Sequence, residues 1–381
     1  MRASRSCSMS FPISLTPILL CIRKFWDSGA AHAGNLKLLL CGSIISQMQE
    51  LLAERNPLYG RKTLALDLAP LPLQDAAQFV PRYPAEDRLA AFGVFGGMPF
   101  DLQFLDPGAP LHSNILRLLL SATGSLVDEP MVLLQSRLRE VSRYASVLAA
   151  IAAGCTQHGE IIGRVREISD SKALGPYLEK LDRMRLLRIE RSMDAHPRAR
   201  NRRYFIADPL IAFWYRFVQP KLSSIIEGFG ADVWRHRIAP HLDEYMGRMF
   251  EEICPEHARQ HSQERFAAPA QEIGRIWQPD YDIDVAGTLL DGSMLYGECK
   301  WSNTRVGEKV LDELIQRAAQ TEYGRGVEHR QFVLYAREGF TSALRKRAAA
   351  QAEIVLHTPQ TMLRSAWRGA SQATPPAGSR R

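Results

Sequence analysis

Residues 281–301 constrain the fold most, because they combine two alternating segments with a tight turn between them. In the first segment, residues 281–286, apolar side chains occupy one face and aspartates, including Asp284, the other. An Asp-Gly-Ser turn follows. The second segment carries Glu298 and Lys300, two residues apart and therefore on one face of a strand. The sequence thus predicts a β-hairpin that gathers Asp284, Glu298 and Lys300 at one place.

These three side chains have the chemistry of a metal-dependent phosphodiesterase. Two neighbouring carboxylates repel each other, and a hard divalent cation relieves that repulsion; Mg²⁺ commonly takes one or two carboxylates and keeps several waters. A lysine beside them can position water or stabilise charge on a phosphate. We therefore expect Asp284, Glu298 and Lys300 to be catalytic. The alternative is a solvated strand face with cross-strand ion pairs.

The composition is that of a globular protein with a mild preference for polyanions. The chain has 381 residues, which suggests two or three domains, and it is 46% hydrophobic and 23% charged. Its net charge of +7 favours nucleic acid as a partner. The 6 cysteines contain no Cys-x-x-Cys pair, so we expect reduced thiols in a cytoplasmic protein and no zinc ribbon. His257 and His261 have helical metal-ligand spacing but no third ligand, which favours a solvated helix over zinc.

The N-terminal region contains two apolar runs. Residues 11–22 include two prolines and are too short to span a membrane. A signal peptide is rejected because charged residues follow the run directly, so no membrane partner is expected. The second run, Leu36–Cys41, predicts a buried parallel strand, and the helix after it would begin at Ser43 or Ser46.

Residues 131–206 have the pattern of a winged helix. Helices are predicted at three places and two wing strands after them: 144–153, 159–165, 172–184, 186–190 and 203–206. The wing loop carries four arginines that suit a phosphate backbone: Arg198, Arg200, Arg202 and Arg203. Winged helices also serve as protein-interaction or lid modules, and that alternative stays open.

The remaining segments complete the domain plan. Helices at residues 73–79 and 86–95 precede the winged helix, the second of them ending at Gly96-Gly97-Met98-Pro99. Residues 207–245 are aromatic-rich and predict a packed helical connector. Residues 246–365 have the order α-β-β-α-β of a small α/β domain, and residues 366–381 have the composition of a disordered tail.

Several of these segments, in this order, resemble the prokaryotic and archaeal ATPases of the STAND/AAA type that carry a C-terminal DUF234 domain. The matching segments are Leu36–Ser43, Pro57–Arg61, Phe95–Pro99, His241–Cys254 and Gly297–Trp301. The resemblance implies an α/β multi-domain chain with these parts: a remnant of a P-loop ATPase core (1–57), a helical lid region (58–130), the winged helix (131–206), the connector (207–245) and a restriction-endonuclease-like domain of the PD-(D/E)xK type (246–365).

The resemblance also implies roles for individual residues. Ser43 ends the segment that matches the sensor-1 strand of the core, and Arg61 matches an arginine after the core; both would be remnants of a nucleotide site. In the terminal domain the resemblance makes Glu251, Asp284 and Glu298 the Mg²⁺ ligands and Lys300 the catalytic lysine.

One departure from the family is large. The phosphate-binding motif G-x-x-x-x-G-K-[ST] occurs nowhere in the sequence. We therefore expect that full-length relatives bind ATP, whereas this N-terminally truncated chain does not hydrolyse it. The strand at 36–41 would lack its neighbours and expose an edge, which a second copy or a partner chain could complete. The leading hypothesis is a DNA-binding protein with a metal-dependent nuclease domain. The alternative is a STAND-type ATP-binding switch whose C-terminal domain binds without cutting.

Overall fold

The computed structural model describes residues 16–30, 38–42, 48, 53–54, 56–168, 170–196 and 202–364. The chain divides into two compact units, one formed by Met1–Ala69 with Glu179–Arg185 and the other by Pro70–Leu178 with Leu186–Arg381. Within the described part of the chain, no helix is long and apolar enough to cross a membrane.

The first unit contains α1 (Thr16–Phe25) and η1 (Trp26–Ala30). The buried strand predicted at Leu36–Cys41 is wrong for its described residues, because residues 38–41 lie in no strand and Leu39 is 69% exposed. A parallel strand needs a neighbouring strand for its backbone hydrogen bonds, and the described residues of this unit supply none. The beginning of the run and Ser43 lie outside the described residues.

The second unit begins with short helices, the first of which include those predicted at residues 73–79 and 86–95. Their bounds are α3 (Leu73–Ala76), η2 (Ala77–Phe79), α4 (Ala85–Phe95), α5 (Pro99–Leu102), α6 (Leu111–Leu119) and α7 (Glu129–Arg137). Helix α4 ends at Gly96, whose φ of 70° suits glycine, as the Gly-Gly sequence predicted.

The next five elements have the order predicted for residues 131–206. They are α8 (Val141–Ala152), α9 (His158–Arg164), α10 (Ser171–Arg183), β1 (Leu187–Arg191) and β2 (Arg202–Ile206). Strands β1 and β2 form an antiparallel pair, and Gln157, just before α9, adds a bridge to Arg203. Three helices followed by a two-stranded hairpin are therefore confirmed as the element order.

The aromatic connector is a run of short helices with a buried interior. It comprises α11 (Pro209–Phe213), η3 (Trp214–Val218), η4 (Gln219–Lys221), α12 (Leu222–Ile226), α13 (Gly230–Val233), η5 (Trp234–Ile238) and η6 (Ala239–His241). Trp214 is fully buried, and its indole Nε1 donates a hydrogen bond of 2.7 Å to the carbonyl of Val127. This burial confirms the prediction of a packed connector.

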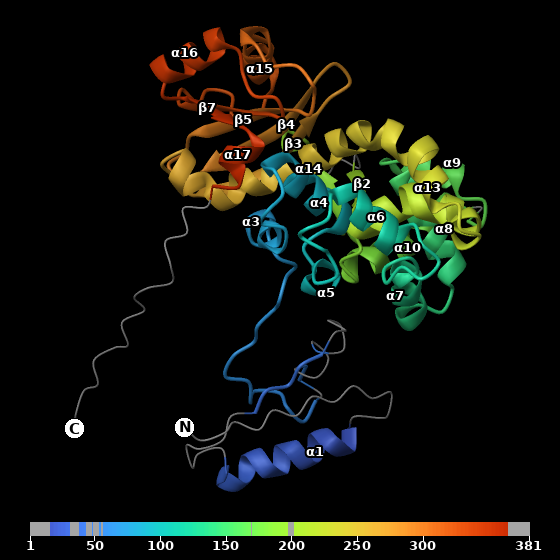
Figure 1. The fold of residues 1–381 in the computed structure, drawn as a ribbon. Helices are drawn as coiled ribbons and strands as arrows, with labels where there is room; N and C mark the ends of the chain where they lie inside the picture. The colour runs from blue at the N-terminus through green and yellow to red at the C-terminus, as the bar shows by residue number, and fades with distance from the viewer. Residues whose placement is uncertain are drawn as a thin grey trace, which may run out of the picture. The chain divides into compact units, whose positions relative to one another are not determined.

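A five-stranded mixed sheet forms the C-terminal part of the second unit (Figure 1). Its elements are α14 (Leu242–Arg265), β3 (Ala270–Trp277), β4 (Asp282–Leu289), β5 (Met294–Lys300), α15 (Glu308–Gln320), β6 (Arg330–Ala336), α16 (Ser342–Ala350), β7 (Ile354–His357) and α17 (Pro359–Met362). The strands lie in the order β3-β4-β5-β6-β7, antiparallel as far as β5 and parallel from β5 to β7. The predicted order α-β-β-α-β is confirmed by α14, β4, β5, α15 and β6, while β3 and β7 are additional.

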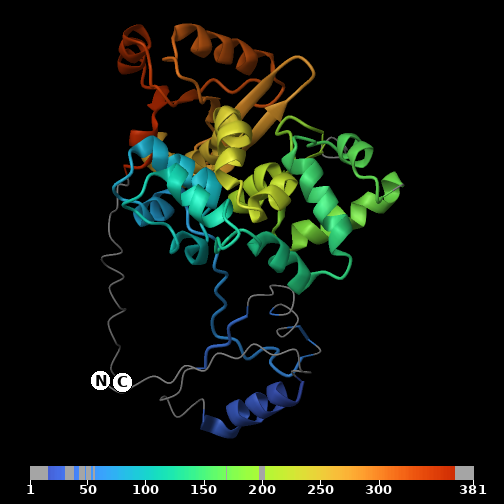
Figure 2. The ribbon, with the colours of Figure 1, turned by 45° about the vertical axis from the view of Figure 1, so that its right-hand side comes forward.

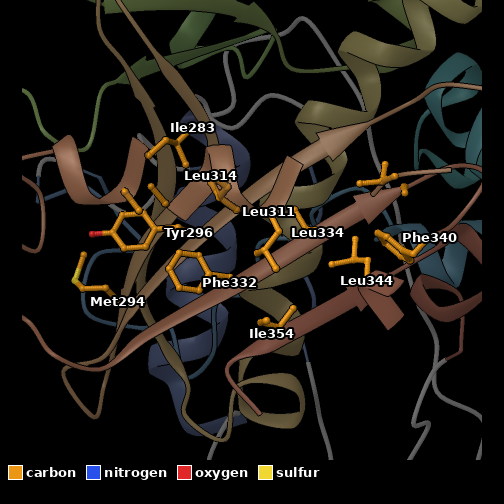
Figure 3. Packing of buried hydrophobic residues seen from close by; sticks show 14 of the residues in the cluster. Ile283, Met294, Tyr296, Leu311, Leu314, Phe332, Leu334, Phe340, Leu344 and Ile354 are labelled. Carbon is orange, nitrogen blue, oxygen red and sulfur yellow. The ribbon is translucent and has the colours of Figure 1, made fainter. Parts of the chain in front are cut away.

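The sheet is covered by helices on both faces. On one face, Tyr296 and Leu334 pack with Leu311 and Leu314 of α15 (Figure 3). On the other, Tyr335 lies against Phe250 of α14, with ring centroids 6.3 Å apart. In Figures 1 and 2, α14 runs between the sheet and the helices of the same unit. The alternation of strand side chains therefore fixes which residues face α14 and which face α15.

The hairpin β1–β2 is joined to the edge of this sheet. The amide of Met193 donates to the carbonyl of Arg275 at 2.9 Å, and the amide of Trp277 donates to Ser192 Oγ at 3.0 Å. These bonds use groups of β3 that would otherwise remain unpaired at the edge, so the hairpin protects this side of the sheet.

Candidate active site

Asp284 lies where strands β4 and β5 stop pairing. The ladder between them ends at Val285 and Gly297. Beyond that point the Asp284 side chain replaces the missing backbone partner, because its Oδ2 accepts a hydrogen bond of 2.9 Å from the amide of Cys299. The register places Glu298 directly across from Asp284. The close approach of the strands also explains the glycine, since a Cβ at Gly297 would lie 2.6 Å from Val333 Cγ1 and 2.8 Å from Val285 Cβ.

Glu298 is buried and held between two cations. Its Oε1 accepts a hydrogen bond of 2.5 Å from Lys300 Nζ, and its Oε2 lies 2.9 Å from Arg317 Nη2. The Glu298 side chain is only 5% exposed, whereas that of Lys300 is 44% exposed. Arg317 is fixed in turn, because its Nη1 donates to the carbonyl of Asp282 at 2.7 Å. Glu298 therefore orients an ammonium group whose outer side remains open to solvent.

Glu251 approaches from helix α14. Arg275 of β3 donates from Nη2 to the Glu251 backbone carbonyl at 2.7 Å, which ties this turn of the helix to the sheet edge. Burial, and then the charge of Asp284, raise the pKa of Glu251 to about 7. The electrostatic effect of one carboxylate on the other indicates that Glu251 and Asp284 share one local environment.

Positive charge compensates the two carboxylates only in part, because Lys300 and Arg275 lower the pKa of each but burial outweighs them. Burial, followed by the charge of Glu298, raises the pKa of Asp284 to about 6. Lys300 behaves differently: burial alone would lower its pKa, but the hydrogen bond and charge of Glu298 outweigh burial and raise it. At neutral pH Lys300 is therefore an ammonium, and a bound cation would lower the raised pKa of both Asp284 and Glu251.

The structure brings the predicted site residues into one neighbourhood but does not arrange them as a complete ligand set. Asp284, Glu298 and Lys300 meet at the ends of β4 and β5, with Glu251 on the adjoining helix. Among the described residues, no group of three or more His, Cys, Asp or Glu side chains has an arrangement that could hold a metal ion. Both oxygens of Glu298 lie at ion-pair distance from cations, Oε1 from Lys300 and Oε2 from Arg317.

Sequence reasoning missed two arginines of this neighbourhood, Arg317 and Arg275. The first follows the inward-facing Leu314 by three positions on α15, and that spacing was the available signal. Arg275 belongs to β3, a strand that the sequence did not reveal.

Cys299 lies between Glu298 and Lys300 on β5 but faces the opposite side of the sheet, toward Cys254 of α14. Burial raises the pKa of both thiols.

The predicted nucleic-acid-binding arginines divide into three cases. Arg198 and Arg200 lie outside the described residues. Arg202 is exposed on β2. Arg203 is half-buried and is occupied within the protein, with its guanidinium 4.7 Å from the centre of the Trp277 ring and 3.9 Å from Asp282 Oδ1. This contact joins the hairpin to the sheet, so it competes with any role for Arg203 in binding phosphate.

The nucleotide-site remnants predicted in the first unit do not meet in the described residues. Ser43 lies outside them. Arg61 donates from Nε and Nη2 to the carboxylate of Asp27 at 2.8 and 2.9 Å. Its guanidinium is thus used in an exposed ion pair within its own unit.

Comparison with known proteins points to a family without an assigned activity. The crystal structure of protein VC1899 from Vibrio cholerae aligns with a TM-score of 0.25 at 11% identity, over 91% of this chain and 77% of that one. The uncharacterized protein MJECL04 of Methanocaldococcus jannaschii is 29% identical over 288 residues, which are 74% of this chain and 64% of that protein, so the chain spans less than two thirds of this relative. The family match begins inside the predicted connector and ends in α15, across the expected boundary at residue 246. Residues 214–311 match DUF234, a family described as archaea bacterial proteins of unknown function.

Proposed function

We propose that this protein hydrolyses phosphodiester bonds of DNA in a metal-dependent reaction at the ends of β4 and β5. One observation carries the proposal: Lys300 is held by the buried Glu298, directly across from Asp284, at the point where the two strands separate. A solvated strand face would not bury Glu298 or raise the pKa of Asp284 to about 6.

The donor set suits Mg²⁺ in its chemistry. Asp284, Glu251 and Glu298 are the oxygen donors that would hold it, since the first two carry carboxyl groups whose ionisation a cation would favour. Bound Mg²⁺ would supply Lewis-acid stabilisation of the phosphate and a more acidic water. Glu298 would have to exchange at least one of its present contacts, with Lys300 or with Arg317, to join that set.

Lys300 has the role of an electrostatic stabiliser in this proposal. In hydrolysis the water oxygen forms a bond to phosphorus and gives up a proton to solvent. The ester bond to the sugar oxygen breaks, and the leaving sugar oxygen takes up a proton. Because Glu298 raises the pKa of Lys300, the lysine stays charged and donates hydrogen bonds to the phosphate oxygens as their negative charge grows. Its 44% exposed side chain can reach a bound strand.

Nucleic-acid binding by the winged-helix-like segment is the second part of the proposal. Its support is the order of three helices and a hairpin, together with the exposed Arg202 at the wing. Arg203 is assigned to packing against Trp277, so the wing loop and Arg202 carry the expected phosphate contacts.

A second candidate function is a regulatory chain of the STAND type whose C-terminal domain binds without cutting. The observation in its favour is the neutralisation of Glu298 by two cations, together with the incomplete ligand set among the described residues. In that case Glu298 would serve folding, and ATP binding would belong to a complementing chain.

Cleavage of supercoiled plasmid and branched DNA with Mg²⁺ or Mn²⁺ tests the proposal. We expect Asp284→Asn and Lys300→Ala to abolish cleavage. Asp282→Asn and Lys309→Ala serve as matched controls, since Asp282 lies on the same strand as Asp284 and the Lys309 side chain is 88% exposed. If all four variants cut as the wild type does, the site is wrong. If well-folded wild type binds DNA without cutting it, the binding module is favoured.

A further inference from the structure

A groove of about 390 Å³ is lined by residues of the winged-helix-like segment and of the connector. These residues are far in the sequence from strands β4 and β5. One wall is a face of α8 that presents small side chains, including Ala149, Ala150 and Ala153. The other walls come from the turn after α9 and from η3 and η4. The volume is in the range of pockets that take small organic ligands.

Three arginines line this groove: Arg164, Arg166 and Arg216. Arg216 is fixed in place, because its Nη1 donates to the Ala153 carbonyl at 3.4 Å and its Nη2 lies 3.7 Å from Glu244 Oε1. That carboxylate is shared with a second arginine, Arg248, whose Nη2 lies 2.7 Å from the same oxygen. One carboxylate therefore serves two guanidinium groups, which leaves the groove side of Arg216 with unbalanced positive charge.

Arg164 and Arg166 are exposed and have no carboxylate within ion-pair distance among the described residues. A single acidic residue, Glu167, lines the groove beside the three arginines. Guanidinium groups present planar donor pairs that match phosphate oxygens, and such bonds are stronger than those between neutral groups. The rim of the groove is therefore suited to a phosphate group.

The floor has a different character from the rim. Ala150 and Tyr215 are each 2% exposed, and the exposed Pro220 also lines the groove. A bare inorganic anion gains nothing from such a floor, whereas a phosphate ester with a flat organic group can bury that group there. The arginine rim suits a phosphate group and the small apolar floor suits a flat organic group, so the groove favours a ligand that has both.

We propose that this groove binds the phosphate ester of a nucleotide, with Arg164, Arg166 and Arg216 on the phosphate and the base or sugar against the alanine face of α8. The nucleotide is either free or part of a nucleic-acid strand, since both offer the same chemistry. This site uses none of the residues assigned to cleavage, so it is tested without metal and without turnover.

The experiment is an equilibrium titration of the full chain in EDTA with two probes, adenosine monophosphate and a short fluorescein-labelled single strand. Arg164→Gln/Arg166→Gln is compared with Arg345→Gln/Lys346→Gln, which removes the same charge from exposed positions of α16. A third variant, Ala149→Leu, fills the groove without changing its charge.

We expect the groove double variant and Ala149→Leu each to weaken binding by at least about tenfold, while the α16 variant stays close to the wild type. Binding of the mononucleotide identifies a free nucleotide as the ligand, and binding of the strand alone identifies nucleic acid. The proposal is overturned if wild type binds neither probe, if both double variants weaken binding equally, or if Ala149→Leu binds normally. Circular dichroism of each variant establishes that the fold is retained.

Discussion

A buried cluster of histidines between α14 and β7 makes the stability of this protein sensitive to acid. The rings of His257 and His357 have centroids 4.9 Å apart, and His261 lies 4.7 Å from His257. Tyr335 closes the cluster, with its hydroxyl 3.1 Å from His257 Nδ1. His257 and His357 are 3% and 2% exposed, and His357 Nε2 has no hydrogen-bond partner in the described structure, so the solvated helix predicted from the spacing of His257 and His261 is wrong at His257.

This environment holds two of the imidazoles neutral. Burial, then the neighbouring His357, His261 and Arg265, lower the pKa of His257 from 6.5 to about 2. Burial, then Arg265 and His261, lower that of His357 to about 3. In the unfolded chain both rings take up a proton near pH 6.5, whereas in the folded protein they do not. The folded state therefore loses stability as the pH falls below 6.5, with each histidine contributing about 1.4 kcal/mol per pH unit.

The magnitude follows directly. Between pH 6.5 and pH 5 each ring costs about 2 kcal/mol, so the pair costs about 4 kcal/mol, a large fraction of a typical folding free energy. Three carboxyls oppose this trend. Burial is the main cause that raises the pKa of Asp101 and Glu251 to about 7 and that of Asp284 to about 6. As the pH falls, these groups take up protons in the folded state before they do so in the unfolded chain, which stabilises the folded state. Their contribution is the same in wild type and in a histidine variant, so it cancels in the comparison.

The assay is urea unfolding at pH 7.5 and pH 5 for wild type and for His257→Gln/His357→Gln. We expect wild type to lose about 4 kcal/mol more than the double variant between the two pH values. The effect of the substitution on the free energy of unfolding also cancels, since each protein at pH 5 is compared with the same protein at pH 7.5. His329→Gln, at an exposed histidine before β6, is the control and should retain the wild-type slope. Equal pH dependence in wild type and double variant would refute the reasoning.

Three further substitutions probe the packing around the candidate site and elsewhere. Gly297→Ala forces a Cβ into the valines of β4 and β6 and should cost about 1–3 kcal/mol in urea unfolding, while Gly163→Ala, which meets nothing within 4 Å, should be neutral or stabilising; similar values for both would contradict the contact argument. Thr341→Ala removes the side-chain acceptor at the start of α16 and should lower the free energy of unfolding by about 1 kcal/mol, with Thr341→Ser retaining most of it. Arg317→Leu leaves the buried Glu298 with one cation and should cost about 3 kcal/mol at pH 7; an unchanged midpoint would show that the ion pair is not needed.

The parts of this fold that could be predicted are those that local sequence determines. The β4–β5 hairpin follows from alternation and an Asp-Gly turn within a few residues, and its register brings Asp284 opposite Glu298 without further information. Strand β7 pairs in parallel with β6 over only four residues, Ile354–His357, so its identity depends on a neighbour rather than on its own pattern. The run at Leu36–Cys41 shows the reverse case, where a strand-like sequence has no strand beside it in the described residues.

In the candidate site, too, the features set by local sequence could be predicted and those set by distant neighbours could not. The acid and lysine spacing of Glu298 and Lys300 is visible in the sequence. The spacing of Arg317 from Leu314 places it toward the inward face of α15, but its contact with Glu298 depends on how α15 packs across the sheet, which spacing alone does not contain. Arg203 was assigned to phosphate because it stands among other arginines, whereas Trp277, which engages it, is distant in the sequence.

The hairpin β1–β2 therefore belongs to the sheet domain as much as to the winged-helix-like segment. Arg188 of β1 bonds Glu190 at 2.5 Å and Glu252 of α14 at 3.2 Å. Burial raises the pKa of Glu252, and Arg188 is the largest influence that counters it. Removing the hairpin would leave this buried carboxyl without its partner, one residue after Glu251. The same helical turn carries Glu251, and a domain boundary drawn at residue 206 would separate Arg188 from its partner on this turn.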